Sequence, residues 1–381
     1  MSSGFLEVDA LLMALLRACQ YSLVGIGFAM LIANTRIVNF AHGYLMLFAC
    51  WIVTLLMKAS FFGADVAGVI FVILLLMVLL GAGLQRLYGL FDRGSDTTYA
   101  DRILIGTVGV GFVLEGLVSV MTNGQALRFP NLEGTQDRSL GWAALMSLAL
   151  LALMFLDRRI SAAARLPGPF CTGLLADAPP RYYGLTLAAV PALLGLIAFA
   201  VLEAGRVLTP AIQRAFADST RIRWDHARLP LLLLTLAFLG VTSVLLRTRA
   251  GLLVRACNAD GRLATRLGFS PRRVERLVFV YSACVAGIGA IFVGLNSNSV
   301  RLSFGFRWTL LGFCCALAAG RLGRLSMAGV AVSALLLGLI EYACGRWSPD
   351  TKVWEAVGFL VLSLVLLASR GEFSWRARFA Q

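Results

Sequence analysis

Long apolar stretches alternate with short polar ones along the whole chain. Windows of about 20 apolar residues, enough to cross a hydrocarbon core of roughly 30 Å as a helix, recur from end to end. The residue-by-residue alternation of a membrane barrel strand is absent, and a helix satisfies its own backbone N–H and C=O groups where water cannot. The pattern therefore predicts an all-α, polytopic membrane helical bundle.

The apolar windows define eleven candidate spans. They are Leu11–Ile32, Val38–Met57, Val66–Leu84, Ile103–Val120, Leu140–Leu156, Leu185–Val201, Leu229–Leu246, Leu277–Leu295, Leu310–Ala319, Met327–Ile340 and Val353–Ala368. The ninth and tenth are short for independent crossings, so we predict about 9–11 transmembrane helices. No large soluble domain fits between the spans, and residues 1–381 are expected to form a single transmembrane domain.

Composition agrees with a membrane environment. Of 381 residues, 59% are hydrophobic and 14% are charged, whereas a typical soluble domain has roughly half and a quarter. The opening segment MSSGFLEVDA contains two acids and no basic residue. We therefore expect the first span to be retained rather than cleaved as a signal peptide.

The distribution of arginine predicts the orientation, because Lys and Arg collect in cytoplasmic loops. Segment 247–276 carries eight arginines, and we place it in the cytoplasm. Counting spans outward puts the basic segments 85–102, 157–184 and 320–325 on the same side. This alternation predicts an N-terminus outside and a C-terminus in the cytoplasm. Segment 202–228 resists it, because it falls outside with five arginines; it is either a surface-lying helix or a place where the count slips.

Membrane topology explains the net charge of +14 more simply than nucleic-acid binding does. The arginines are spread over predicted cytoplasmic loops with no basic face interleaved with aromatics, so no nucleic-acid partner is expected. The eight cysteines show no C-x-x-C spacing and are expected to be small buried residues. His42 and His226 are the two imidazoles, and no carboxylates cluster, so we expect no metal site and no cofactor.

Residues for catalysis or ATP hydrolysis do not stand out. A P-loop requires Gly-Lys-Ser/Thr, but the lysines Lys58 and Lys352 follow Met57 and Thr351. No catalytic constellation clusters, so we do not expect an enzyme. Active transport by this chain would use an ion gradient or a separate subunit.

Segment 247–276 contains a spaced motif in RTRAGLLVRACNADGRLATRLGFSPRRVERLVF. It resembles the coupling loop of permease subunits of bacterial ATP-binding-cassette importers, in the branched-chain amino acid permease family, with the pattern T-x-x-G-x-x-x-R-A-x-x-x-D-x-x-x-A-x-x-x-G. The matching residues are Thr248, Gly251, Arg255, Ala256, Asp260, Ala264 and Gly268. The last three share one helix face, where small residues can seat in a partner's groove. The resemblance implies docking to a cytoplasmic ATP-binding subunit; the alternative is a generic basic loop that fixes topology.

The segment NFAHG, Asn39 to Gly43, resembles a signature that follows the first helix in the same family. Asn39, His42 and Gly43 stand at i, i+3 and i+4, so they share one side of a helix, and the glycine permits close approach of a neighbour. In one interpretation Asn39 caps the second helix and His42 bonds to a neighbouring helix. In the other, these residues line the translocation path or its gate.

Two acids lie within predicted spans, where a carboxylate is costly and usually faces the bundle interior. Glu115 in TVGVGFVLEG and Glu341 in GLIEYACG both lie in segments that resemble the family. Glu115 is the better candidate for the translocation path, with an interhelix polar contact as the alternative. Glu341 is expected near an interface in a structural role.

The resemblance covers roughly 11–156 and 230–372, with departures. Tyr44 and Ala259 stand where the family commonly has acids, and 368–373 (ASRGEF) replaces an R-P-x-G ending. Region 157–228 holds proline-rich segments and looks like an inserted loop-plus-helix region.

The resemblance implies a permease subunit in a bacterial inner membrane. Its implied partners are cytoplasmic ATP-binding subunits, an identical or homologous permease, an extracytoplasmic substrate-binding protein and membrane lipid. The implied substrates are branched-chain or other small amino acids, or urea and short amides. An ion-coupled secondary transporter or channel without ATPase partners is the alternative.

Overall fold

A computed structural model describes residues 3–35, 38–58, 66–91, 99–129, 182–216, 228–247, 271–297, 299–321 and 327–347, with the single positions 254, 357, 360 and 364. The helices and strands in these ranges are α1 (Ser3–Thr35), α2 (His42–Lys58), α3 (Val66–Phe91), α4 (Tyr99–Thr122), β1 (Leu127–Arg128), α6 (Tyr182–Phe216), α7 (Arg228–Arg247), α10 (Pro271–Ser297), β2 (Ser299–Val300), α11 (Phe304–Arg321) and α12 (Met327–Trp347).

The predicted all-α membrane bundle is confirmed. Within the described ranges, six helices are long and apolar enough to cross a membrane, or seven if α6, which bends by 40° between Ala192–Gly205 and Val207–Arg214, counts as one span. α2 and α11 are shorter apolar helices. The predicted spans 140–156 and 353–368 lie outside the described residues, apart from three single positions.

Several helix boundaries differ from the sequence prediction, and four of the differences bear on the site or the topology. α2 begins at His42 rather than at 38, and α11 begins at Phe304 rather than at 310. α12 continues past 340 to Trp347 and is long enough to cross on its own. α6 does not end at 201 but continues to Phe216, so the first part of the segment that resisted the topology count is helical.

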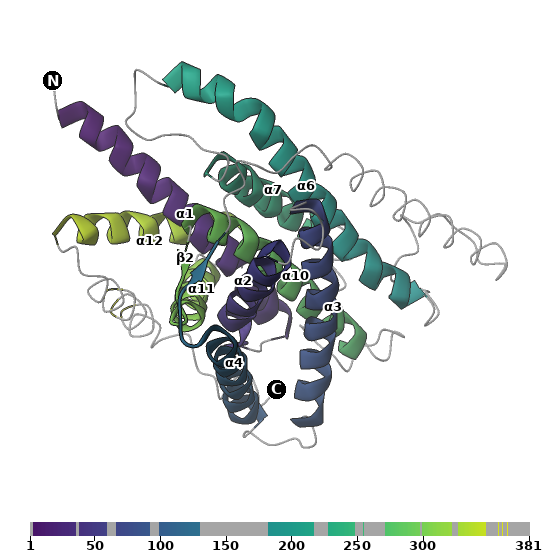
Figure 1. Ribbon diagram of the computed structural model, residues 1–381. Helices are drawn as coiled ribbons and strands as arrows, with labels where there is room; N and C mark the ends of the chain where they lie inside the picture. The colour runs from purple at the N-terminus through teal and green to yellow at the C-terminus, as the bar shows by residue number, and fades with distance from the viewer. Residues whose placement is uncertain are drawn as a thin grey trace.

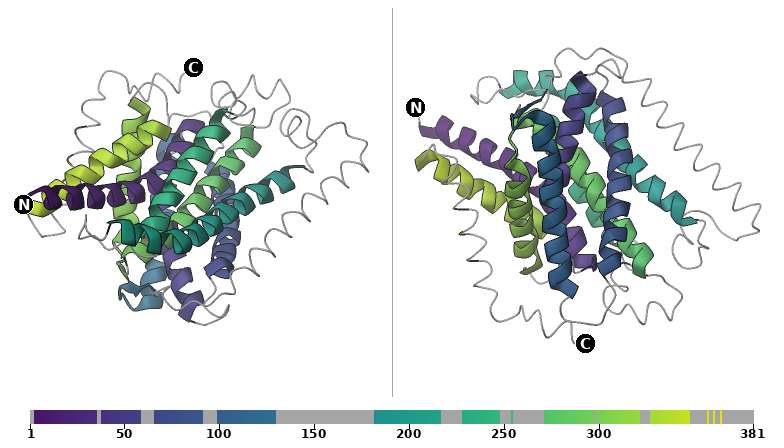
Figure 2. Two further views of the ribbon diagram at one scale, coloured as in Figure 1. Left: turned by 90° about the horizontal axis from the view of Figure 1, so that it is seen from above. Right: turned by 60° about the horizontal axis from the view of Figure 1, so that its bottom comes forward.

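α10 and α1 form the centre of the bundle. The apolar window of α10 is 94% buried and that of α1 is 83% buried, whereas the window of α4 is 22% buried. Small residues permit this packing: Gly287 of α10 faces Met77 of α3, and Gly81 of α3 faces the Val280 backbone. Figures 1 and 2 show α12 beside α1, and α6 along the outside of the bundle.

Contacts fix the relative directions of the central helices. Leu23 of α1 lies beside Gly289 of α10, and Gly27 accepts a hydrogen bond from Ser282 Oγ, so α1 and α10 are antiparallel. The rings of Tyr21 and Phe28 in α1 neighbour those of Trp308 and Phe313 in α11, so α1 and α11 are parallel. The first turn of α11 is therefore near the end of α10.

The end of α3 and the start of α10 lie at one face of the bundle. Gln85 Nε2 donates to the Arg272 carbonyl oxygen over 3.4 Å, and Arg276 Nε donates to Gln85 Oε1 over 3.2 Å. Gln85, Arg272 and Arg276 belong to the segments 85–102 and 247–276, two that the arginine distribution predicts on one side. The first turn of α11 points to the opposite face.

Candidate functional site

The NFAHG segment forms a buried junction between α1, α2, α10 and α11. We use "the junction" for Asn39, His42 and Gly43 with the residues they contact. Asn39 is 2% exposed, and its Oδ1 accepts hydrogen bonds from the Ala41 N–H (3.1 Å) and the Tyr88 hydroxyl (3.3 Å). It thus satisfies a free N–H at the start of α2, as an N-cap does. The capping geometry that the sequence suggested is present.

His42 lies at the centre of the junction and is 0% exposed. Its Nδ1 is 3.2 Å from Ser282 Oγ, and that hydroxyl donates to the Gly27 carbonyl oxygen. A serine hydroxyl has one hydrogen, and that of Ser282 is already donated to Gly27. In the bond between His42 and Ser282, the hydrogen is therefore carried by His42 Nδ1, and Ser282 Oγ accepts it. Nε2 is then an acceptor, and it has no partner among the described residues. The ring of Phe28 covers the imidazole edge-on at 4.8 Å.

Gly43 allows the first turns of α2 and α11 to meet. Its N–H donates to Thr309 Oγ1 over 3.1 Å, and Thr309 Oγ1 lies 3.1 Å from the Phe40 carbonyl oxygen. A Cβ at Gly43 would overlap the carbonyl oxygen of Gly305 and lie 2.5 Å from the Thr309 nitrogen. Two short helices therefore begin inside the bundle at a point of backbone contact.

A cavity of about 380 Å³ lies beside the junction. We use "the cavity" for the space lined by α1, α2, α4, α11, α12 and Val357. Its lining residues are Tyr21, Tyr44, Phe112, Glu115, Ser303, Phe306, Arg307, Leu310, Leu311, Leu337, Ile340, Glu341 and Val357. Its walls are mainly apolar with a few charged groups, which is the usual character of a small-molecule site.

Tyr44 separates the junction from the cavity. Its ring fits between Gly111 of α4 and Gly305 of α11, where added Cβ atoms would lie 2.5 and 2.6 Å from ring carbons. The ring of Phe112 is 6.1 Å away. The residue that stands where the family commonly has an acid is thus an aromatic wall of the cavity.

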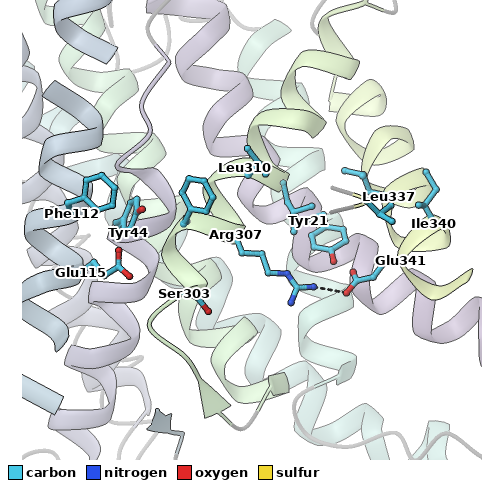
Figure 3. A pocket seen from close by; sticks show the side chains of 13 residues that line it. Tyr21, Tyr44, Phe112, Glu115, Ser303, Arg307, Leu310, Leu337, Ile340 and Glu341 are labelled. Carbon is cyan, nitrogen blue, oxygen red and sulfur yellow. Dashed lines mark hydrogen bonds and ion pairs between the residues drawn. The ribbon is translucent and has the colours of Figure 1, made fainter. Parts of the chain in front are cut away.

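Charged groups occupy the two ends of the cavity (Figure 3). Glu115 of α4 lies beside Tyr44 at one end, and Arg307 of α11 reaches Glu341 of α12 at the other. Arg307 Nη2 and Glu341 Oε1 are 2.9 Å apart. An ion pair inside the bundle balances two charges that would each be costly alone.

The structure brings together some of the predicted residues but not all. Asn39, His42 and Gly43 share the junction, and Glu115 lines the cavity next to it. The predicted coupling residues lie outside the described residues. They are Arg255, Ala256, Asp260, Ala264 and Gly268.

Of the 13 residues that line the cavity, the sequence interpretation singled out Tyr44, Glu115 and Glu341 and missed the other ten, which include Arg307, Phe112 and Phe306. For Arg307 a signal existed: a charge within the apolar run FGFRWTLL can be treated in the same way as an acid within a span. Phe112 and Phe306 carry no such signal, because an aromatic residue in an apolar helix is ordinary.

Comparisons with known proteins give one family. The family model described as branched-chain amino acid transport system / permease component matches residues 10–367. The permease protein LivH of the high-affinity branched-chain amino acid transport system of Escherichia coli K12 is 31% identical over 132 residues, which is 35% of this chain and 42% of LivH. BraD of Pseudomonas aeruginosa, named for the same kind of system, has the same identity and coverage. The match thus spans less than half the length of these relatives. No solved structure matches the chain significantly.

Proposed function

Because the chain belongs to the family of branched-chain amino acid transport permease components, we propose that it is the transmembrane permease subunit of an ATP-binding-cassette importer. Its cargo is a branched-chain or other small amino acid, and separate subunits hydrolyse ATP. The observation that carries the proposal is the family match over almost the whole chain, within a multi-pass helical bundle. The membrane is a bacterial inner membrane, as for the family's transport systems.

In this proposal the cavity is part of the translocation path. It lies toward the first turn of α11, away from the face at which α3 ends and α10 begins. If the face at which α3 ends and α10 begins is cytoplasmic, as the arginines predict, the cavity lies toward the opposite side, from which an extracytoplasmic binding protein delivers substrate. Glu115 lines the path, and the junction of Asn39, His42 and Gly43 closes it below the cavity.

Coupling to ATP is assigned to segment 247–276. Asp260, Ala264 and Gly268 seat against a cytoplasmic ATP-binding subunit, and the start of α10 receives the resulting displacement. The hydrogen bonds of Gln85 with Arg272 and Arg276 carry it on to α3. A second permease, identical or homologous, completes the complex, and the exposed apolar side chains of α4 offer it a surface.

The test uses a host strain that lacks the chromosomal gene and carries a tagged copy. We expect L-leucine uptake to depend on the tagged chain, and an ATP-binding protein to co-purify with it. Asp260→Lys should abolish both while the amount of chain in the membrane stays constant. Asp177→Lys, an equal charge change outside the coupling motif, is the control.

Two outcomes contradict the proposal. One is uptake that continues without ATP and stops on addition of a proton or sodium ionophore, which indicates an ion-coupled transporter. The other is an Asp260→Lys chain that retains its ATP-binding protein and full uptake.

A further inference from the structure

The Arg307–Glu341 pair has features that a simple tie between two helices does not need. Both residues line the cavity, with side chains 31% and 12% exposed. Only one oxygen of Glu341 is bonded: Oε1 accepts from Arg307 Nη2 at 2.9 Å, whereas Oε2 is buried with no hydrogen-bond partner among the described residues. A buried carboxylate oxygen without a donor is costly. The pair is therefore incomplete at its negative end.

The positive end of the pair lies at the start of a helix. Arg307 belongs to the first turn of α11, and Ser303, just before that helix, also lines the cavity. The N-terminus of a helix carries partial positive charge, so it favours an anion, although the N–H groups of Phe304, Gly305 and Arg307 already donate to carbonyl oxygens of the preceding turn. A guanidinium group in the same place presents a planar fork of donors that matches a carboxylate.

Apolar side chains adjoin the pair. Leu310 follows Arg307 by one helical turn, and Leu337 and Ile340 precede Glu341 on α12 (Figure 3). The cavity volume of about 380 Å³ is within the usual range for small-molecule sites. An aliphatic chain of a few carbons beside the pair would contact these three residues.

We propose that Arg307 and Glu341 bind the charged head of an α-amino acid in the cavity, with the carboxylate on Arg307 and the ammonium group on Glu341. The aliphatic side chain lies against Leu310, Leu337 and Ile340. This inference rests on the proposed function and adds to it the residues that recognise the substrate.

Charge balance at the Arg307–Glu341 pair favours binding of a zwitterion over binding of an amine or a carboxylate alone. A zwitterion adds one positive and one negative charge to an existing pair, so each charge gains an opposite neighbour and the net charge of the site is unchanged. An amine or a carboxylate alone brings an unbalanced charge into a low-dielectric site. The pair should therefore select amino acids over amines and fatty acids of the same shape.

The test measures binding to the purified full-length chain in lipid nanodiscs, without a substrate-binding protein whose own selectivity would mask that of the cavity. The probe is radiolabelled L-leucine, competed with 4-methylpentanoate, which lacks the ammonium group, and isopentylamine, which lacks the carboxylate. We expect each analogue to compete about tenfold or more weakly than unlabelled L-leucine, since each loses a charge-assisted hydrogen bond. This comparison needs no variant.

Variants then locate the site. Arg307→Gln and Glu341→Gln should each weaken L-leucine binding about tenfold or more, whereas Arg214→Gln, at an exposed position of α6, should not change it. The exchange of both residues, Arg307→Glu with Glu341→Arg, restores an ion pair between α11 and α12 but reverses its polarity. We expect it to recover thermal stability without recovering binding.

The proposal is overturned by any of three results. These are no saturable L-leucine binding by the wild-type chain, analogues that compete as well as L-leucine, or single variants that bind within twofold of wild type. The leucine uptake of the tagged strain decides separately whether the proposed function holds. A chain that supports ATP-dependent uptake but fails these binding tests keeps its function and loses only this site.

Discussion

The junction and the cavity share α2 and α11 as walls, yet the first is closed to solvent and the second is open. At the junction, His42 is 0% exposed and Asn39 is 2% exposed, and backbone approaches backbone at Gly43. In the cavity, Arg307 is 31% exposed and Glu115 is half-buried. The difference teaches that polar residues in one membrane bundle lie in two settings: those enclosed by protein fix helix positions, whereas those that line a space, even when bonded to each other as Arg307 and Glu341 are, also face its contents. Substitutions should distinguish these two settings.

The largest effect is expected at Gly43. Gly43→Ala would place a methyl group against the backbone of Gly305 and Thr309, and these atoms cannot move without displacing α11. We expect the free energy of unfolding to fall by about 3 kcal/mol, seen as a lower unfolding midpoint in detergent. The matched control is Gly116→Ala on α4, where an added Cβ meets nothing within 4 Å and helix propensity favours alanine. Equal midpoints for the two variants would contradict the close contact.

His42→Ala should have the second largest effect. It removes a buried ring, leaves Ser282 without its hydrogen-bond donor and opens a void beside Phe28. We expect the free energy of unfolding to fall by about 2 kcal/mol. If the junction also closes the translocation path, uptake should fall more than the amount of protein in the membrane. His226→Ala, which replaces the other histidine of the chain, is the control. Equal losses of uptake and protein would leave His42 with a packing role alone.

Asn39→Ala should cost less than His42→Ala. It removes the acceptor for the Ala41 N–H and for the Tyr88 hydroxyl, and loss of a helix cap costs about 1 kcal/mol. Asn39→Ser, which keeps a capping oxygen, should recover most of that stability, and Tyr88→Phe should lose only a fraction. Thermal unfolding of the three variants gives the order; a serine variant no better than alanine would argue against capping.

Glu115→Gln should have the smallest effect on stability, because its carboxylate makes no hydrogen bond or ion pair with the described residues, and we expect a change within about 0.5 kcal/mol. Its effect on transport should be larger: leucine uptake should fall severalfold if the carboxylate lines the path. Glu203→Gln on α6 is the matched control. An unaltered uptake rate at unaltered protein level would remove Glu115 from the path and leave the cavity to the Arg307–Glu341 pair.

The sequence was enough to predict the bundle and most of its helices, because a span is a local feature that about 20 consecutive residues define. It did not predict where α2 and α11 begin. Residues 38–41 are mostly apolar and read as helix, but in the fold they form the turn that Asn39 caps. Conversely, Arg307 breaks the apolar run before 310, and its partner Glu341 is 34 residues away. A local window of sequence does not show the contact between Arg307 and Glu341.

The candidate site divides in the same way. The NFAHG motif is contiguous, so the sequence identified Asn39, His42 and Gly43 together, although not the residues they contact, and the acids Glu115 and Glu341 stand out as charges within apolar helices. The cavity, however, needs side chains from five helices, and only the fold shows that the rings of Tyr44 and Phe112 lie next to each other at one end of it. The neutralising partner of Glu341 could be found only from the structure.

The antiparallel pairing of β1 with β2, Leu127 opposite Val300 and Arg128 opposite Ser299, adds a mechanical consequence. It ties the segment that follows α4 to the link between α10 and α11, and the ring of Phe129 fills the space beside Gly294. On the other side, Gly338 brings α12 against the backbone of α1 at Ala14. The cavity thus has α4, tied to the link between α10 and α11, on one side, and α12, held against α1, on the other. A change in its volume requires α4 or α12 to tilt relative to α11, and the bond between Arg307 and Glu341 is a latch that holds α12 to α11.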